Sequence, residues 1–259
     1  MDPTTQTAPV VSLVIATYRR FDRLQRCIAG IRRNVRIPHE IIVVGTGAGD
    51  GTDAWLAAQA DIRFIRESRR EGATRAYNRG FRAAGGTYVL WLNDDAYPLP
   101  GSVEAAVRMI ERPDLPDLGM VAFYHNLDRE WNRLDSIEHE GLIYSIYNVR
   151  GVPYANFGLL RRDLLERIGY LDERYYFCAW DPDLSLKVQR EAGLQVLGCR
   201  DARVYHEELI DERKSEDLER VANEDNARLF EKWGLPPRFT YPDPRPAYQR
   251  LCRELQLIG

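Results

Sequence analysis

The sequence is poor in cysteine, and its four cysteines are too far apart for a zinc motif or a CxxC redox pair. It also lacks an excess of positive charge: the formal net charge of -3 disfavours a nucleic-acid-binding protein. No apolar run approaches the roughly 20 residues of a membrane-spanning helix. The first residues lack the basic start and apolar core of a signal peptide. We therefore expect a cytoplasmic protein with no transmembrane segment and no nucleic-acid partner, and peripheral contact with the inner membrane face stays open.

Short apolar runs and helical patterns alternate through the first half of the chain. Runs rich in β-branched and aromatic residues predict buried strands at 11–17, 39–45 and 87–93 and a further strand at 118–126. The alternating pattern at 61–67 predicts a strand nearer the edge of the sheet. Between these strands, apolar residues spaced three and four apart predict amphipathic helices, the first through Leu24, Cys27, Ile28 and Ile31. This alternation predicts an α/β fold with a mostly parallel, Rossmann-like sheet and helices on both faces.

The second half of the chain is less regular. It predicts a hairpin within 127–150, a short strand at 194–199, and helices around 161–168, 183–192 and 216–233. Five prolines between Pro236 and Tyr248 predict an extended tail. We therefore divide the chain into a disordered N-terminus (1–9), an α/β half (10–126), a less regular half of the same domain (127–235) and a proline-rich C-terminal tail (236–259).

A glycine-rich loop follows the second predicted strand and resembles a dinucleotide-binding turn at first sight. Such a turn needs the spacing G-x-G-x-x-G directly after the first strand of the unit. Counted from Gly45, the third glycine position holds Asp50, and counted from Gly47 it holds Thr52. The spacing and the place of the loop therefore disfavour an NAD- or FAD-binding enzyme.

Polar motifs follow three of the predicted parallel strands. They are TYRR at 17–20, GTGAGDG at 45–51 and NDDAYP at 93–98. In open α/β sheets, ligands bind beyond the carboxyl ends of the strands, which meet at one edge. We therefore expect these three motifs to form a single site.

The chain resembles a family-2 glycosyltransferase with the GT-A fold over about residues 10–208. Five segments carry the resemblance, in the order in which the family has them. They are VSLVIATYRR (11–20), VVGTGAGDGT (43–52), EGATRAYNRGFRAAGGTYVLWLNDD (71–95), GYLDERYYFCAWDPDLSLKVQREAG (169–193) and ARVYH (202–206). The resemblance implies that 10–126 binds a nucleoside-diphosphate sugar and that 127–235 binds the acceptor.

The resemblance also implies which side chains contact the donor. Family members commonly carry an Asp that contacts the base where this chain has Gly45, so the base of the donor stays open. Arg75 would approach the diphosphate, which suits a guanidinium, and Asp94 would face the ribose. The implied nucleotide-sugar-binding residues are Thr17, Tyr18, Arg20, Gly45, Thr46, Arg75, Asn93 and Asp94.

The NDD motif at 93–95 also predicts a metal site. Hard divalent cations prefer carboxylate oxygens, and Mg²⁺ commonly takes one or two of them together with substrate phosphates. Asp95 is the expected ligand for Mn²⁺ or Mg²⁺, which would neutralise charge on the leaving diphosphate. By resemblance, His206 supplies a further ligand.

Asp181 is the expected catalytic base. An inverting transfer needs a group that takes the proton of the acceptor hydroxyl, and Asp181 resembles the aspartate of the family's Glu-Asp pair. Trp180 replaces the Glu and could stack on an acceptor sugar. Asp183 either contacts the acceptor or, as we favour, stabilises the first turn of its helix by charge.

We therefore expect a metal-dependent, inverting glycosyltransferase that moves a sugar from a nucleoside-diphosphate sugar to a hydroxyl of a glycan, lipid-linked or small-molecule acceptor. One alternative is a non-catalytic nucleotide-sugar-binding module. Gly45 and Trp180 favour it because they replace acidic residues that family members commonly carry. The other is a sugar-phosphate nucleotidyltransferase. That class carries a glycine-rich basic loop after its first strand, where this chain has ATYRRFDR without a glycine.

Overall fold

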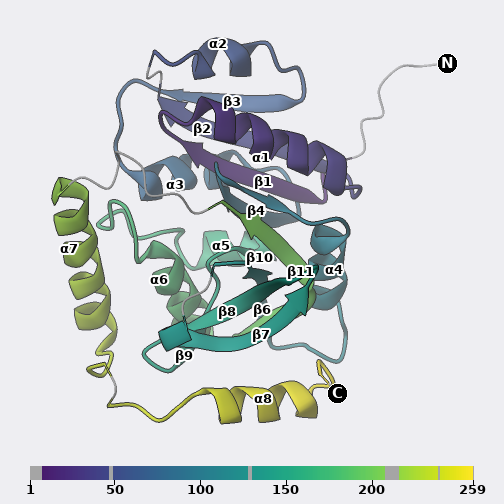
Figure 1. The fold of residues 1–259 in the computed structure, drawn as a ribbon, viewed down its shortest axis with the longest axis vertical. Helices are drawn as coiled ribbons and strands as arrows, with labels where there is room; N and C mark the ends of the chain where they lie inside the picture. The colour runs from purple at the N-terminus through teal and green to yellow at the C-terminus, as the bar shows by residue number, and fades with distance from the viewer. Residues whose placement is uncertain (1–7, 47–48, 128–129, 208–215, 239, 259) are drawn as a thin grey trace.

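The computed structural model describes residues 8–46, 49–127, 130–207, 216–238 and 240–258 (Figure 1). The disorder predicted for 1–9 lies almost wholly outside these ranges and stays a prediction. A single sheet runs through the described residues. One half of it is the parallel set β3-β2-β1-β4, formed by Ile62–Glu67, His39–Thr46, Val11–Thr17 and Tyr88–Asn93. These are four of the strands predicted from sequence, with the alternating 62–67 run at the sheet edge as its pattern indicated.

The other half of the sheet departs from the prediction. β6 (Leu118–His125) runs in the same direction as β4, but β10 (Gly158–Arg161) lies between them and is antiparallel to both. β10 has only four residues, too short for its periodicity to be recognised beside the helix that follows. The strand predicted at 194–199 is longer in the structure, where β11 spans Gln195–His206. After an irregular register near 199–203, β11 continues and pairs with β5 (Ala96–Pro98).

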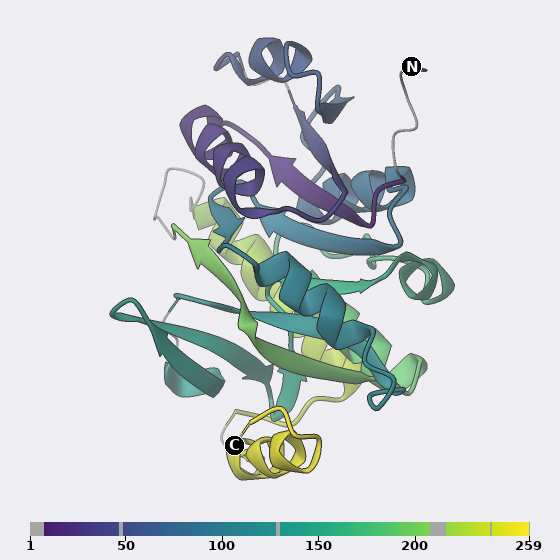
Figure 2. The same cartoon turned by 90° about the vertical axis from the view of Figure 1, so that its right-hand side faces the viewer.

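Helices cover both faces of the sheet, as predicted (Figure 2). α1 (Phe21–Asn34) and α4 (Ser102–Ile110) lie on one face, where Glu104 accepts hydrogen bonds from the backbone of residues just after α1. The other face carries α3 (Ala73–Ala83), α5 (Arg162–Arg167) and α6 (Trp180–Leu186), which continues into a π-helical turn (Lys187–Glu191). The short α2 (Thr52–Ala57) packs against β3.

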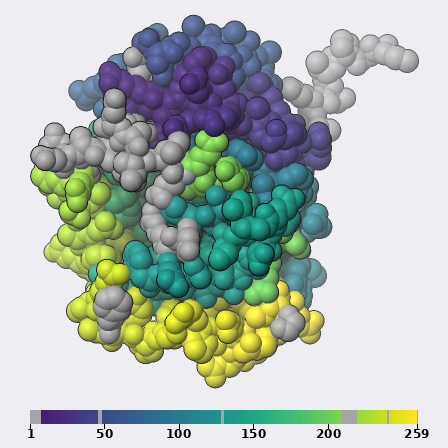
Figure 3. Space-filling view, viewed as in Figure 1, coloured from purple at the N-terminus to yellow at the C-terminus, as the bar shows by residue number. Residues whose placement is uncertain are grey.

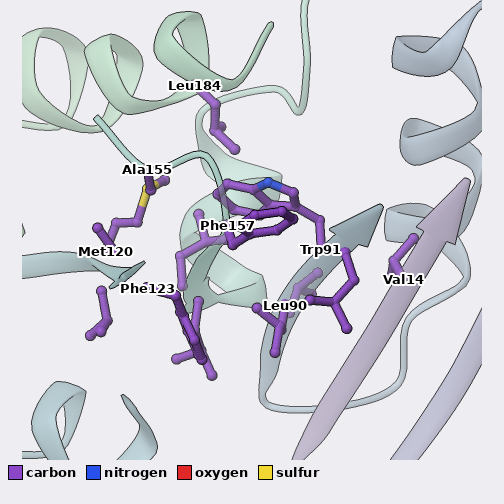
Figure 4. Close-up of a cluster of buried hydrophobic side chains, with 14 of the residues drawn as sticks. Val14, Leu90, Trp91, Met120, Phe123, Ala155, Phe157 and Leu184 are labelled. Carbon is purple, nitrogen blue, oxygen red and sulfur yellow. The ribbon is translucent and has the colours of Figure 1, made fainter. Parts of the chain in front are cut away.

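The core between the two halves of the sheet is built around Trp91 on β4 (Figure 4). Its ring lies beside Phe157, and Met120 and Leu184 enclose the same cluster. β10 can cross this ring only with a glycine at 158, since a Cβ there would lie 2.4 Å from the Trp91 ring. This close approach places residues 155–157, just before β10, against the end of β4.

The second half of the chain adds a hairpin and two helices. The predicted hairpin is present as β7 (Arg133–His139) and β8 (Leu142–Val149), followed by β9 (Val152–Tyr154). The predicted helix at 216–233 is α7 (Glu216–Trp233), and α7 and the C-terminal residues form the left and lower margins of the molecule in Figure 3. The prediction of an extended tail is wrong for α8 (Arg245–Glu254), whose Tyr248 and Cys252 are buried. Pro246 fits because the first helical turn needs no amide donors from it.

Of the helices in the described ranges, none combines the length and the apolar character that crossing a bilayer requires.

Candidate active site

A cavity of about 690 Å³ opens between the two halves of the chain. One end of it is lined by residues at the carboxyl ends of the parallel strands, among them Ala16, Asn93 and Asp95. The other end is lined by residues around β8 and β9 and by one side of α7. Asp181 and His206 line the same cavity, so the structure brings together the base and both metal ligands expected from the sequence.

A charged cluster forms where β1 and β4 end side by side. The Thr17 hydroxyl donates to Asp94 Oδ2 at 2.9 Å, and Arg20 Nη1 lies 3.2 Å from Asp94 Oδ1. The same nitrogen of Arg20 also forms a hydrogen-bonded ion pair with Asp95. Asp94 and Asp95 are 4% and 7% exposed, so Arg20 supplies the positive charge that two adjacent buried carboxylates require.

The two carboxylates differ in their proton affinity. Burial raises the pKa of Asp94 to about 7, against the opposing charge of Arg20. Burial acts on Asp95 in the same direction, but the hydrogen bond and charge of His206, with the charge of Arg20, outweigh it and lower the pKa of Asp95. Asp95 is therefore the better anionic ligand, and Asp94 suits contact with neutral hydroxyl groups.

Asp95 and His206 could together hold a divalent cation. Asp95 Oδ1 lies 3.1 Å from His206 Nε2, and Asn93 Nδ2 lies 3.4 Å from the same ring nitrogen. Among the described residues, no three His, Cys, Asp or Glu side chains gather into a metal site. Two protein ligands fit Mg²⁺ or Mn²⁺ when substrate phosphates and water supply the remaining ones.

Gly45 lies directly beside Thr17, its register partner on the neighbouring strand. A Cβ at position 45 would lie 2.7 Å from Thr17 Cγ2 and 2.8 Å from the Thr17 carbonyl oxygen. A larger residue at 45 therefore requires Thr17 to move, which explains why glycine occupies this position. Thr46 ends β2, and its side chain lies outside the described residues.

Asp181 is held by a chain of side-chain hydrogen bonds. Asn156 Nδ2 donates to Asp181 Oδ2 at 2.9 Å, and Asn156 Oδ1 lies 3.1 Å from Nε2 of the buried His125. The backbone oxygen of Asn156 accepts a bond from Trp91 Nε1 at 2.8 Å. Asn156 is thus fixed at three atoms and orients the Asp181 carboxylate.

The structure does not bring every predicted residue into the cavity. Arg75 on α3 is half-exposed, forms a 3.6 Å ion pair with Glu173 and does not line the cavity. Asp183 is buried and accepts hydrogen bonds from Tyr175 and from the indole of Trp233, while Lys232 pairs with it at 2.8 Å. Two residues after Asp181 in a helix, it faces α7.

Two aromatic residues that were predicted to contact ligands, Trp180 and Tyr18, have other surroundings in the structure. Trp180 lines the cavity but is only 6% exposed, because its ring packs against Tyr77 at 4.6 Å and against Trp91 at 5.9 Å. This packing favours a structural role over stacking on a sugar. The centre of the Tyr18 ring lies 4.5 Å from the Arg70 guanidinium carbon, and Tyr18 is not among the residues that line the cavity.

Helix α7 contributes residues that the sequence did not mark as functional. Asn223, Asn226 and Phe230 line the cavity. On the same helix, the buried Asp225 carboxylate accepts hydrogen bonds from the backbone N–H groups of Tyr176, Phe177 and Cys178 at 2.8–3.1 Å. α7 therefore fixes the segment that leads into Asp181. A mid-helix acid has no local pattern that indicates such a contact.

Comparison with known proteins points to one family. The sequence model of the family described as "Glycosyl transferase family 2" matches residues 12–169. A protein named "Uncharacterized glycosyltransferase YwdF", from Bacillus subtilis, is 27% identical over 235 residues, covering 87% of this chain and 84% of that protein. "Glycosyltransferase AglE" from Haloferax volcanii is 26% identical over 222 residues, covering 79% of this chain and 71% of that protein.

Two solved structures share the fold. The mannosyltransferase PcManGT from Pyrobaculum calidifontis, in complex with GDP-Man and Mn²⁺, has a TM-score of 0.65 at 19% identity and is covered over 71% of its length by 97% of this chain. GalNAc-T7 with UDP, GalNAc and Mn²⁺ has a TM-score of 0.62 at 13% identity, with 96% of this chain covering 55% of it. These similarities confirm the predicted GT-A architecture.

Proposed function

Since the chain belongs to glycosyl transferase family 2, we propose that it moves one sugar from a nucleoside-diphosphate sugar to an acceptor hydroxyl, with inversion at the anomeric carbon. The observation that carries this proposal is the single cavity lined by both Asp95 and Asp181. An in-line displacement needs support for the leaving diphosphate on one side of the sugar and a proton acceptor on the other.

The donor end holds the nucleotide sugar through the ends of β1, β2 and β4. Asp94, whose pKa is raised to about 7, contacts the ribose hydroxyls, and Thr17 with the backbone at Gly45 and Thr46 borders the base. Asp95 and His206 would hold Mn²⁺ or Mg²⁺, which would neutralise charge on the leaving diphosphate. Arg20 adds a positive charge at the same end, and the partial exposure of Arg75 leaves it able to turn toward the diphosphate.

The acceptor end carries the proton transfer. Asp181 takes the proton of the acceptor hydroxyl while the oxygen of that hydroxyl forms a bond to the anomeric carbon. The bond from the anomeric carbon to the diphosphate oxygen breaks at the same time. Asn156 keeps Asp181 Oδ2 hydrogen-bonded, which leaves one rotamer of the carboxylate favoured. Among the described residues that line the cavity, the only carboxylates are Asp95 and Asp181. Since Asp95 is assigned to the metal, no further carboxylate is left to act as a covalent nucleophile, which supports inversion.

The proposal is tested by incubating the protein with a panel of sugar nucleotides and Mn²⁺ and measuring released nucleoside diphosphate. We expect one or a few donors to be hydrolysed slowly without acceptor, and Asp95→Ala to remove the metal-dependent part. Glu224→Ala, which changes an exposed acid on α7, serves as the matched control.

Each alternative has its own outcome in this assay. Metal-dependent binding of a sugar nucleotide, seen as thermal stabilisation, without any release of nucleoside diphosphate would identify a binding module. Formation of pyrophosphate from a nucleoside triphosphate and a sugar phosphate would identify a nucleotidyltransferase.

A further inference from the structure

Arg150 occupies an unusual position at the acceptor end of the cavity. With Gly151 it forms the two-residue turn between β8 and β9, where Val149 pairs with Val152. Both turn residues have positive φ angles, 51° for Arg150 and 89° for Gly151. Turns of this kind favour Asn or Gly at the first position, because a left-handed backbone is unfavourable for residues with larger side chains. An arginine at such a position points to a use for its side chain.

The side chain of Arg150 lies against the cavity and contacts an aromatic ring. Its central carbon is 4.4 Å from the ring centre of Phe230 on α7, and Arg150 lines the cavity together with Asp181. Its Nη1 atom is buried and has no hydrogen-bond partner within the described residues. A buried cationic N–H without an acceptor is costly, and a small shift of the side chain toward an anion bound in the cavity would satisfy it.

Two arginines outside the cavity that contact aromatic rings, Arg82 and Arg190, have polar partners within the protein. Arg82 lies 5.0 Å from the Tyr170 ring and pairs with Glu173 at 3.3 Å. Arg190 lies 5.8 Å from the Trp233 ring and donates to the Trp233 carbonyl oxygen at 2.6 Å. Arg150 differs from both because its Nη1 has no acceptor in the part of the chain that the structure describes.

Further positive charge lies at the same end of the cavity. Arg238 also lines it, 4.5 Å from the ring of Trp131, which is 57% exposed. Arg20, at the donor end, is balanced by Asp94 and Asp95. Among the described residues at the acceptor end of the cavity, the charged side chains are therefore Arg150, Arg238 and Asp181, and the walls include aromatic rings.

We propose that Arg150 binds an oxyanion group, a phosphate or a carboxylate, carried by the acceptor beside the hydroxyl that is glycosylated. This inference rests on the proposed function, because it assigns the far end of the cavity to the acceptor. A guanidinium presents a planar fork of donors that matches phosphate and carboxylate oxygens. The stack on Phe230 holds this fork in place before the ligand arrives.

The test is a binding measurement that needs no turnover. Calorimetry would compare geranyl phosphate with geraniol, and glucose 1-phosphate and glucuronate with methyl glucoside, on the wild type and on Arg150→Asn. Asparagine tolerates the left-handed backbone, so this variant should melt at the wild-type temperature or above. Arg82→Gln removes a ring-stacked arginine outside the cavity and is the matched control.

We expect at least one anionic probe to bind the wild type and the control equally, and to bind Arg150→Asn about 10–100-fold more weakly. The neutral counterparts should not distinguish the variants. Preference for geranyl phosphate would indicate a lipid phosphate, and preference for glucose 1-phosphate or glucuronate an anionic sugar.

Equal binding of every anionic probe to the wild type and Arg150→Asn, or no binding of any probe up to about 10 mM, would overturn the inference. Absence of donor hydrolysis in the separate release assay would instead count against the proposed function, so the two failures are distinguishable. If Arg150→Asn melts well below the wild type, Arg150→Lys, which keeps the charge but loses the fork, replaces it, with weakened anion binding again expected.

Discussion

The two ends of the cavity satisfy their polar groups in different ways. At the donor end, charges are paired within the protein: Arg20 with Asp94 and Asp95, and Asp95 with His206. At the acceptor end, the lining includes amides, aromatic rings and Arg150, whose buried Nη1 has no partner in the described part of the chain. The donor end is built on strand ends, whereas the acceptor end is assembled from a turn, a helix and a loop.

This difference has a physical consequence. A donor with a constant diphosphate group can be served by charges fixed on neighbouring strands of a rigid sheet. The acceptor end depends on α7, which holds residues 176–178 through Asp225. Changes at α7 should therefore affect acceptor use before they affect donor binding.

The largest expected effect separates chemistry from binding. Asp181→Asn removes the proton acceptor and nearly preserves the shape of the side chain, so transfer to a competent acceptor should fall about 10²–10⁴-fold. Donor affinity, measured by calorimetry with Mn²⁺, should stay within about two-fold, because Asp181 belongs to the acceptor side. Unchanged transfer would remove Asp181 from the mechanism.

A smaller loss is expected when Asp181 keeps its charge but loses its orientation. Asn156→Ala removes the 2.9 Å hydrogen bond to Asp181 Oδ2, and kcat should fall about 10–100-fold. The KM for the donor should change little, since the hydrogen bonds of Asn156 within the described residues go to Asp181, His125 and Trp91. An equal loss in kcat and in donor affinity would show that Asn156 supports the whole cavity instead.

The contribution of α7 is tested by local exchange. Asp225→Ala leaves three backbone amides without their acceptor, which should destabilise residues 176–178 locally by about 1.5–2 kcal/mol. Hydrogen exchange at Tyr176, Phe177 and Cys178 should accelerate about 10–30-fold. Glu224→Ala, in an exposed pair on the same helix, should leave these rates unchanged. Wild-type rates in Asp225→Ala would rule out this anchoring.

The smallest effect concerns the donor end. Gly45→Ala places a Cβ against Thr17 and should reduce the free energy of unfolding by at least about 1 kcal/mol. Combining it with Thr17→Ser removes the Cγ2 contact and should recover part of the loss in a double-mutant cycle by urea unfolding. Gly85→Ala, whose Cβ would meet its nearest neighbour at 3.4 Å, is the control. Additive effects of the two substitutions would contradict direct contact.

The sequence predicts those parts of the site whose residues directly follow predicted strands. It predicts less well the parts that are formed by segments far apart in the chain. Asp94, Asp95 and Thr17 follow apolar strands, and parallel strands bring their carboxyl ends to one edge, so these residues could be placed together without coordinates. β10 escaped prediction because four residues carry no clear period, and α8 because the prolines around it suggested an extended chain.

The acceptor end could not be predicted in the same way. Asn156 lies in a loop before β10 and meets Asp181 only through the packing of that strand across Trp91. The local sequence at Arg150 indicates only a turn. The proposed binding role of Arg150 depends on its contact with Phe230, 80 residues later on α7. Contacts between segments so distant in the chain leave no spacing that a single sequence reveals.

The most direct experiment asks whether the cation and the proposed base, Asp181, share one cavity. Paramagnetic broadening of side-chain amide signals by Mn²⁺ would be measured with a nucleoside diphosphate present, since the Asn156 amide donates to Asp181. We expect strong broadening of the Asn156 signal in the wild type and no broadening of it in Asp95→Ala. An Asn156 signal that stays sharp while Mn²⁺ and the nucleotide are bound would contradict a shared cavity.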